Sequence, residues 1–101
     1  MDKRSVKRIS VGEEIRISHG NLLFSGTILN LSEKGMFIGT RKRFPLNAIS
    51  VIMMRLKDKL LQIPIKIKRA AKPSGYYDGI GVELLSTPQD YLDFIKIWKK
   101  S

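Results

Sequence analysis

The chain has 101 residues, of which 43% are hydrophobic and 28% are charged, a balance that predicts one folded domain and argues against wholesale disorder. It contains no cysteine and one histidine, which excludes disulfides, thiolate nucleophiles, thiolate zinc sites and multi-histidine metal sites. Nineteen Lys and Arg against nine Asp and Glu give a formal net charge of +10, so composition favours an anionic partner: a nucleotide, a nucleic acid, an acidic protein surface or an anionic membrane. We find no candidate transmembrane segment and no hydrophobic signal region, and therefore expect a cytoplasmic protein.

The first eight residues are predicted to form a flexible basic arm. Lys3, Arg4, Lys7 and Arg8 stand there against one acidic residue, Asp2. Arg4 and Arg8 are four residues apart, so in an extended arm they lie on one side, about 13 Å apart at about 3.3 Å per residue. The planar donor fork of arginine suits phosphate oxygens and the edge of guanine, and it stacks on flat rings. A basic tail can equally be a solvated segment, so this pattern alone leaves both interpretations open.

Short strands are predicted through the middle of the chain. They cover residues 15–18, 22–31, 36–38, 49–56, 61–68 and 76–84, separated by turns or loops at 19–21, 32–35, 39–47, 57–59 and 72–75. Gly26 inside the second strand indicates a bulge or a sharp bend. Pro64 lies in the strand with the clearest alternation of apolar and polar residues. Because proline cannot donate to a ladder, its nitrogen must face an edge or a bulge.

A helix is predicted over residues 88–100. Thr87 is a suitable N-cap, Pro88 suits the first helical position, and Asp90 lies near the positive end of the helix. The apolar residues that recur at helical spacing are Tyr91, Leu92, Ile95 and Trp98. We expect this stripe to pack on the strands, with a partner or dimer face as the alternative. Short strands followed by one amphipathic helix predict an all-β fold, a small antiparallel barrel capped or flanked by that helix.

Catalytic interpretations find little support. Glu13 and Glu14 are adjacent, so on a strand they point to opposite faces and cannot act as a pair across a cleft. His19 lies in a turn with no orienting partner in view. The sequence Gly79-Ile80-Gly81 lacks the third glycine and the following helix of a dinucleotide fingerprint. We therefore expect no enzyme activity, no metal and no cofactor.

A second motif, N-x-S-x-x-G, spans residues 30–35 between two predicted strands. Asn30 and Ser32 have short side chains that can bond both backbone and ligand from a turn, and Gly35 permits a positive φ. An ordinary strand connection uses the same residue types, so the motif by itself leaves both interpretations open.

The order R-x-x-x-R, then N-x-S-x-x-G about twenty residues later, then short strands ending in Gly-Ile-Gly-Val-Glu, resembles the PilZ domain family from Arg4 to Leu84. The family pattern is R-x-x-x-R followed by [D/N]-x-S-x-x-G. The resemblance implies an all-β fold, a small six-stranded antiparallel β-barrel with a C-terminal α-helix. It also implies a single domain over residues 1–101, with the arm at 1–8, the barrel at 9–85 and the helix at 88–100.

The ligand implied by the resemblance is the bacterial second messenger cyclic di-GMP. Arg4 and Arg8 would then grip guanine and phosphate, while Asn30 and Ser32 contact the other side of the ligand and Gly35 shapes the turn. Many family members have Asp where this chain has Asn30, and Asn lacks a carboxylate that accepts from guanine N1 and N2. Further candidate contacts are Lys3, Lys7 and Arg69.

The resemblance implies a cytoplasmic receptor that changes conformation on binding cyclic di-GMP and signals to a protein partner in motility, biofilm or exopolysaccharide control. One alternative is a nucleic-acid-binding small β-barrel, which fits the +10 charge and the basic loop at 41–43. The eight aromatic residues show no clear stacking pattern, so we do not expect nucleic acid as the partner. The other alternative is a PilZ-fold protein-interaction adaptor without ligand, a kind that generally lacks the arginine motif. The sequence leaves open a monomer or a homodimer, and one or two ligand molecules.

Overall fold

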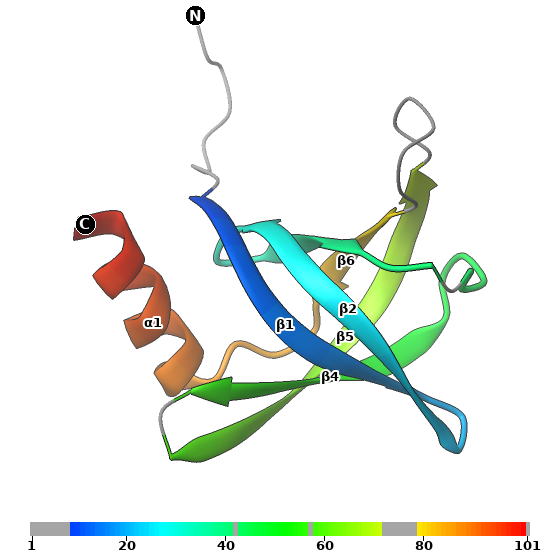
Figure 1. The fold of residues 1–101 in the computed structure, drawn as a ribbon, viewed down its shortest axis with the longest axis horizontal. Helices are drawn as coiled ribbons and strands as arrows, with labels where there is room; N and C mark the ends of the chain where they lie inside the picture. The colour runs from blue at the N-terminus through cyan, green and yellow to red at the C-terminus, as the bar shows by residue number, and fades with distance from the viewer. Residues whose placement is uncertain (1–8, 42, 57, 72–78, 101) are drawn as a thin grey trace, which may run out of the picture.

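The computed structural model describes residues 9–41, 43–56, 58–71 and 79–100 (Figure 1). Within this part of the chain, six strands and one helix follow one another: β1 (Ile9–His19), β2 (Leu22–Leu31), β3 (Gly35–Gly39), β4 (Ile49–Leu56), β5 (Lys59–Ala71), β6 (Gly79–Leu84) and α1 (Gln89–Lys100). All strand pairs are antiparallel, and they close into a barrel in the order β1-β2-β3-β6-β5-β4. The predicted six-stranded antiparallel barrel with a C-terminal helix is confirmed.

The core fills the inside of the barrel with alternate residues of each strand. On β5 the alternation is complete, since Leu61, Ile63, Ile65 and Ile67 are all buried. Branched aliphatic side chains dominate because they pack well on a pleated surface. The other buried residues of the strands are Ile15, Ile17, Ile28, Leu31, Met36, Ile38, Ser50, Ile52, Met54, Gly79, Ile80, Val82, Leu84 and Gly26.

Helix α1 lies beside the barrel, next to the start of β1 and the end of β4 (Figure 1). Tyr91 and Ile95 are one turn apart on the helix and are fully buried against the barrel core, and Leu92 is partly buried. The predicted packing of the apolar stripe is confirmed for these residues, while the side chain of Trp98 is outside the described part. None of the described helices has the length and hydropathy needed to cross a membrane.

The position of the β2 bulge differs from the prediction. Ile28 pairs with Ile38 and Asn30 with Phe37, so the extra residue of β2 is Leu29 and not Gly26. Gly26 is required for a different reason: a Cβ there would lie 2.9 Å from a side-chain carbon of Ile38. The glycine therefore leaves room for core packing.

Pro64 occupies an edge-like position even though the barrel is closed. Its carbonyl accepts a hydrogen bond from Leu85 N at 2.9 Å, and β6 ends one residue earlier, at Leu84. In an antiparallel sheet the nitrogen and the carbonyl of one residue face the same neighbouring strand. The nitrogen of Pro64, which has no hydrogen to donate, therefore faces the region just beyond the end of β6. The pairing of β5 with β4 is therefore kept, as the sequence predicts.

Candidate functional site

The turn at residues 32–35 is held by its own hydrogen bonds. Ser32 N donates to Gly35 O at 2.9 Å, and Gly35 N donates to the Ser32 hydroxyl at 3.2 Å. From the neighbouring strand, Leu84 N donates to Lys34 O at 2.9 Å. The Ser32 side chain is 5% exposed, so it braces the turn from within. The turn is thus fixed largely by backbone groups, independently of any ligand.

Gly35 does not adopt the positive φ that the sequence suggests. Among the described residues, positive φ angles occur at Gly20 and Asn47. A Cβ at Gly35 would instead lie 2.9 Å from the backbone oxygen of Val82, on the adjacent strand β6. Glycine is therefore needed here for close approach of two backbones and not for an unusual conformation.

Asn30 carries an unsatisfied acceptor next to this turn. Its side-chain oxygen Oδ1 is buried and has no hydrogen-bond partner among the residues that the structure describes. A buried polar atom without a partner is unfavourable and uncommon in folded proteins, so it marks a place where a donor from outside can be bound. The Leu29 bulge sets the position of Asn30 by placing it opposite Phe37.

Asn30 belongs to a row that crosses four strands. It pairs with Phe37 on β3, Phe37 pairs with Gly81 on β6, and Gly81 pairs with Arg69 on β5. Paired residues point to the same face, and Phe37 is flanked by buried residues, so the row lies on the outer face of the barrel. With about 4.8 Å between strands, Asn30 and Arg69 are about 14 Å apart along it.

Arg69 lies across this row. A Cβ at Gly81 would be 3.1 Å from Cγ and 3.2 Å from Nε of Arg69, so the arginine side chain covers the glycine. The guanidinium group of Arg69 therefore lies against the surface of the sheet, on the same face as Asn30. Neither Phe37 nor Gly81 was identified as a site residue from the sequence, because their place in the row depends on strand register.

The structure brings together three of the predicted site residues, Asn30, Ser32 and Gly35, where β2 ends and β3 begins. Arg69 is on the same face, at the other end of the row. The predicted arm residues Arg4 and Arg8, with Lys3 and Lys7, lie outside the described residues. The arm joins the barrel close to the turn, since Ile9 pairs with Leu31.

Tyr91 is a part of this region that sequence reasoning missed. Its hydroxyl donates a hydrogen bond to Ser32 O at 2.7 Å, across 59 residues of sequence, and the bond is buried. Periodicity places Tyr91 in the apolar stripe of α1 and gives no sign of this polar contact. The bond ties helix α1 directly to the 32–35 turn.

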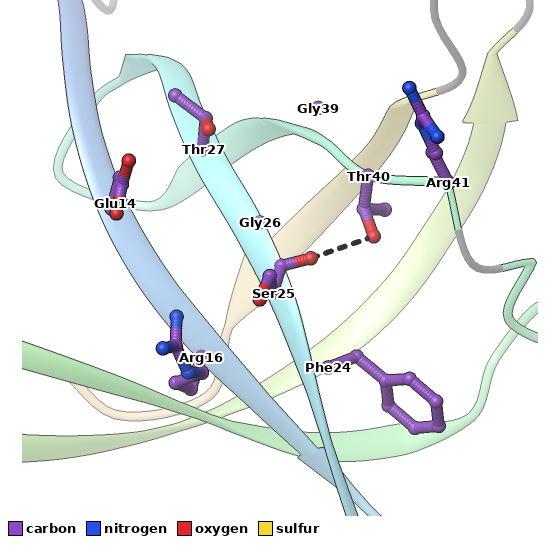
Figure 2. Close-up of a pocket in the computed structure, with 9 residues that line it drawn as sticks. All are labelled: Glu14, Arg16, Phe24, Ser25, Gly26, Thr27, Gly39, Thr40 and Arg41. Carbon is purple, nitrogen blue, oxygen red and sulfur yellow. Dashed lines mark hydrogen bonds between the residues drawn. The ribbon is translucent and has the colours of Figure 1, made fainter.

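A polar hollow of about 700 Å³ lies on the barrel surface over β1, β2 and β3 (Figure 2). Glu14 and Arg16 flank it from β1, and Arg41 lies on the opposite side of β2. Its wall is fixed by Thr40, whose hydroxyl donates to Ser25 O at 3.1 Å. This hollow adds two cationic side chains to the surface next to the Asn30 row. No group of three or more His, Asp or Glu side chains in the described part of the chain is arranged to hold a metal ion.

Comparisons with known proteins identify the family and the fold. The PilZ domain model matches residues 2–96. Among solved structures, the inhibitor of motility MotI/DgrA of Bacillus subtilis is similar with a TM-score of 0.79 and 14% identity, covering 99% of this chain and 51% of that chain. The PilZ domain of YcgR from Escherichia coli, solved with c-di-GMP, has a TM-score of 0.73 and 12% identity, with coverages of 98% and 91%. The MrkH–c-di-GMP complex of K. pneumonia has a TM-score of 0.69 and 17% identity, with coverages of 99% and 56%.

The chain spans about half the length of MotI/DgrA and MrkH, and nearly all of the YcgR PilZ domain. No curated protein sequence matched. At these identities the likeness to the solved structures shows a common fold.

Proposed function

The chain belongs to the PilZ domain family, and we propose that it is a cytoplasmic bacterial receptor that binds cyclic di-GMP and passes the signal to a protein partner. The single observation that carries the proposal is the buried Oδ1 of Asn30, beside the braced 32–35 turn, for which the described residues supply no hydrogen-bond partner. It lies in a chain that also carries the R-x-x-x-R motif of the family. Motility, biofilm formation or exopolysaccharide production is the process that we expect such a receptor to regulate.

The site offers groups that complement the ligand. Cyclic di-GMP has two negative charges and two flat purines, and the N–H groups of one guanine would donate to Asn30 Oδ1. We assign guanine and phosphate contacts to Arg4 and Arg8, since charge-assisted bonds from arginine are stronger than neutral ones. Ser32 and Gly35 hold the shape of the turn, and the turn contacts the ligand. Among the further candidates, Arg69 would meet the ligand from the far end of the row, and Lys3 and Lys7 would add positive charge.

In this proposal, the signal is the closure of the arm over the ligand. An arm that closes over the ligand loses conformational freedom, which lowers affinity below what its contacts alone would give. The bound and free states then differ at the arm and at the neighbouring surface, and a protein partner can distinguish them. The role assigned to the chain is that of a receptor, with no catalytic step.

Isothermal titration with cyclic di-GMP tests the proposal. We expect Arg8→Ala and Asn30→Ala each to weaken binding, with Arg8→Ala lowering affinity about tenfold or more. Arg43→Ala removes the same charge from the exposed β3–β4 loop and serves as the matched control, with little change expected. Absence of cyclic di-GMP binding by the unmodified chain would refute the proposal.

The same protein tests the nucleic-acid alternative. If the chain binds nucleic acid, a single-stranded oligonucleotide should bind with an affinity that falls steeply as the salt concentration rises and that does not change when cyclic di-GMP is added. In that case Arg43→Ala, and not Asn30→Ala, would weaken binding.

A further inference from the structure

A second concave surface is lined by residues of helix α1, by Glu13 of β1 and by residues at the end of β4 and the start of β5. Helix α1 lies beside the end of β4 in Figure 1. This helix groove has a volume of about 630 Å³ and shares no lining residue with the Asn30 row or the 32–35 turn. Leu56, Phe94 and Ile97 line it with apolar surface, and Glu13, Asp58 and Asp93 line it with carboxylates. A volume of this size accommodates several side chains of another molecule.

The apolar part of the groove is accessible. Ile97 is 60% exposed, and Leu56 and Phe94 are partly buried where they pack against the barrel core. Three large apolar side chains in one concavity provide the kind of surface on which apolar side chains of a partner can be buried.

The charge of the groove is opposite to that of the whole chain. Four of its lining residues are acidic and two are basic, in a chain whose formal net charge is +10. One of the two cations, Lys59, is already paired with Asp90 at 3.4 Å. Glu13 and Asp58 form no ion pair with any described cation. Asp93 accepts a hydrogen bond from Gln89 Nε2 at 2.9 Å. The excess of carboxylates in the lining favours a positively charged partner, which the rest of the surface would repel.

We propose that the helix groove is the docking site for a basic, partly apolar segment of the protein partner. Lys or Arg side chains of that segment face Glu13, Asp58 and Asp93, and its large apolar side chains pack on Phe94 and Ile97. The inference rests on the proposed function in one respect, namely that the chain signals to a protein partner. Charge decides against an acidic peptide, a nucleic acid or an anionic membrane at this place, because each would meet carboxylates.

Other basic segments fit the groove less well. The chain's own residues 1–8 are basic but contain only Met1 and Val6 as apolar residues, too few to cover the three apolar side chains. A second copy of the chain would bring a surface of the same net charge, +10, toward the first, which opposes association.

The groove is connected to the candidate ligand site through α1. Tyr91 donates to Ser32 O in the turn, and Asp93 and Phe94 follow within three residues on the same helix. The Tyr91–Ser32 hydrogen bond is therefore the contact through which ligand binding beside the turn would reach the groove. By thermodynamic linkage, cyclic di-GMP then changes affinity for the docked segment, and the segment changes affinity for cyclic di-GMP by the same factor.

The experiment uses the full chain, labelled with ¹⁵N, and two synthetic 12-residue peptides as probes. Both peptides carry four leucines at helical spacing, and the remaining positions are Lys in one and Glu in the other. We expect the Lys peptide to bind and to shift amide signals of the groove residues, and the Glu peptide not to bind. Reversing two groove charges in Asp58→Lys/Asp93→Lys should lower affinity for the Lys peptide about tenfold or more.

Glu14→Lys is the control for charge, with one reversal against the two of the double variant. Glu14 is adjacent to Glu13 but points away from the groove, into the polar hollow over β1 to β3 (Figure 2). It makes the same charge reversal one residue from the groove, so a single such change should alter affinity at most about threefold. If Glu14→Lys weakens binding as much as the double variant, only net charge matters and the docking site is refuted.

Two further outcomes would overturn the choice of occupant. Groove signals that shift when residues 1–8 are deleted, without peptide, identify the arm as the occupant. Groove signals that shift with protein concentration identify a second copy.

The receptor proposal and the docking proposal fail separately. If cyclic di-GMP does not bind while the Lys peptide still shifts the groove, the proposed receptor function fails and the docking site stands. If cyclic di-GMP binds and the peptide does not, the docking site fails.

Discussion

The 32–35 turn and the helix groove meet the same helix, yet they are built in opposite ways. In the turn, backbone groups and the nearly buried Ser32 side chain hydrogen-bond to one another, and Tyr91 adds a buried bond from α1. The groove exposes Asp58, Asp93 and Ile97, the last to 60%, while Leu56 and Phe94 in its lining are partly buried against the core. A hydrogen-bonded frame beside Asn30, whose Oδ1 has no partner in the described part of the chain, suits a single small ligand. Exposed charges on an apolar surface suit a peptide of variable sequence.

The comparison implies a difference in how the two regions respond to substitution. Changes in the turn should alter folding as well as ligand binding, because the same atoms serve both. Changes at the exposed groove residues Asp58, Asp93 and Ile97 should alter docking with little effect on folding. The following variants test this difference, starting with the largest expected effect.

Removing Tyr91 should have the largest effect, since it breaks the link between the two regions. We expect Tyr91→Ala to lower the free energy of unfolding by about 3–5 kcal/mol, because a fully buried aromatic ring leaves a cavity. Tyr91→Phe keeps the ring but leaves Ser32 O without its donor, and should lower the free energy of unfolding by about 1–3 kcal/mol. Urea unfolding measures both values.

Ile97→Ala on the same helix is the control for Tyr91, with a change expected within about 0.5 kcal/mol because the residue is exposed. Tyr91→Phe should also reduce the coupling between cyclic di-GMP and the Lys peptide. A Tyr91→Phe protein as stable as the parent, with an unshifted Ser32 amide signal, would show that the hydrogen bond does not hold the turn.

Gly35→Ala tests how closely the turn approaches β6. Its new Cβ would lie 2.9 Å from the backbone oxygen of Val82, which cannot rotate away, so β3 and β6 must separate. We expect a loss of about 1–3 kcal/mol in urea unfolding. Gly12→Ala is the matched control, because no described atom lies within 4 Å of a Cβ there, and it should be neutral or stabilise by up to about 1 kcal/mol. Equal effects of the two substitutions would contradict the close approach.

Asn30→Asp separates stability from ligand binding within the site. The variant places a carboxylate where Oδ1 has no partner among the residues that the structure describes, so the unliganded chain should lose about 1–2 kcal/mol of stability. Because a carboxylate accepts stronger hydrogen bonds than an amide, cyclic di-GMP should bind about tenfold more tightly. Urea unfolding and isothermal titration give the two quantities. Asn21→Asp makes the same change on an exposed turn and should affect neither; a ligand affinity that falls in Asn30→Asp would exclude a guanine donor at this atom.

Sequence periodicity accounts for most of the fold because strand alternation and burial are local properties. The four apolar residues of β5 from Leu61 to Ile67 are predicted and found inside the barrel for that reason. The position of the β2 bulge cannot be predicted from such local patterns. Whether Gly26 or Leu29 is the irregular residue depends on pairing with β3, and a glycine in the sequence does not distinguish a bulge from a close packing contact.

The same distinction limits what the sequence predicts about the sites. Motif spacing predicts Asn30 and Ser32, since they stand two residues apart in one local segment. The Tyr91 contact to Ser32 O spans 59 residues, and the groove collects Glu13, Asp58 and Asp93 from three separate segments. Only the closed barrel brings these groups together, so neither feature leaves a local pattern in the sequence.

The smallest expected effect belongs to the Lys59–Asp90 ion pair, which lies within the groove. Lys59 Nζ and Asp90 Oδ2 are 3.4 Å apart, with side chains 67% and 44% exposed, so solvent screens their attraction. We expect Lys59→Ala to change the free energy of unfolding by at most about 1 kcal/mol. It should nevertheless strengthen binding of the Lys peptide, because it removes a competing cation and frees Asp90. A loss of stability as large as that of Gly35→Ala would mean that the groove, like the turn, is part of the folding framework, and the contrast between the two regions would not hold.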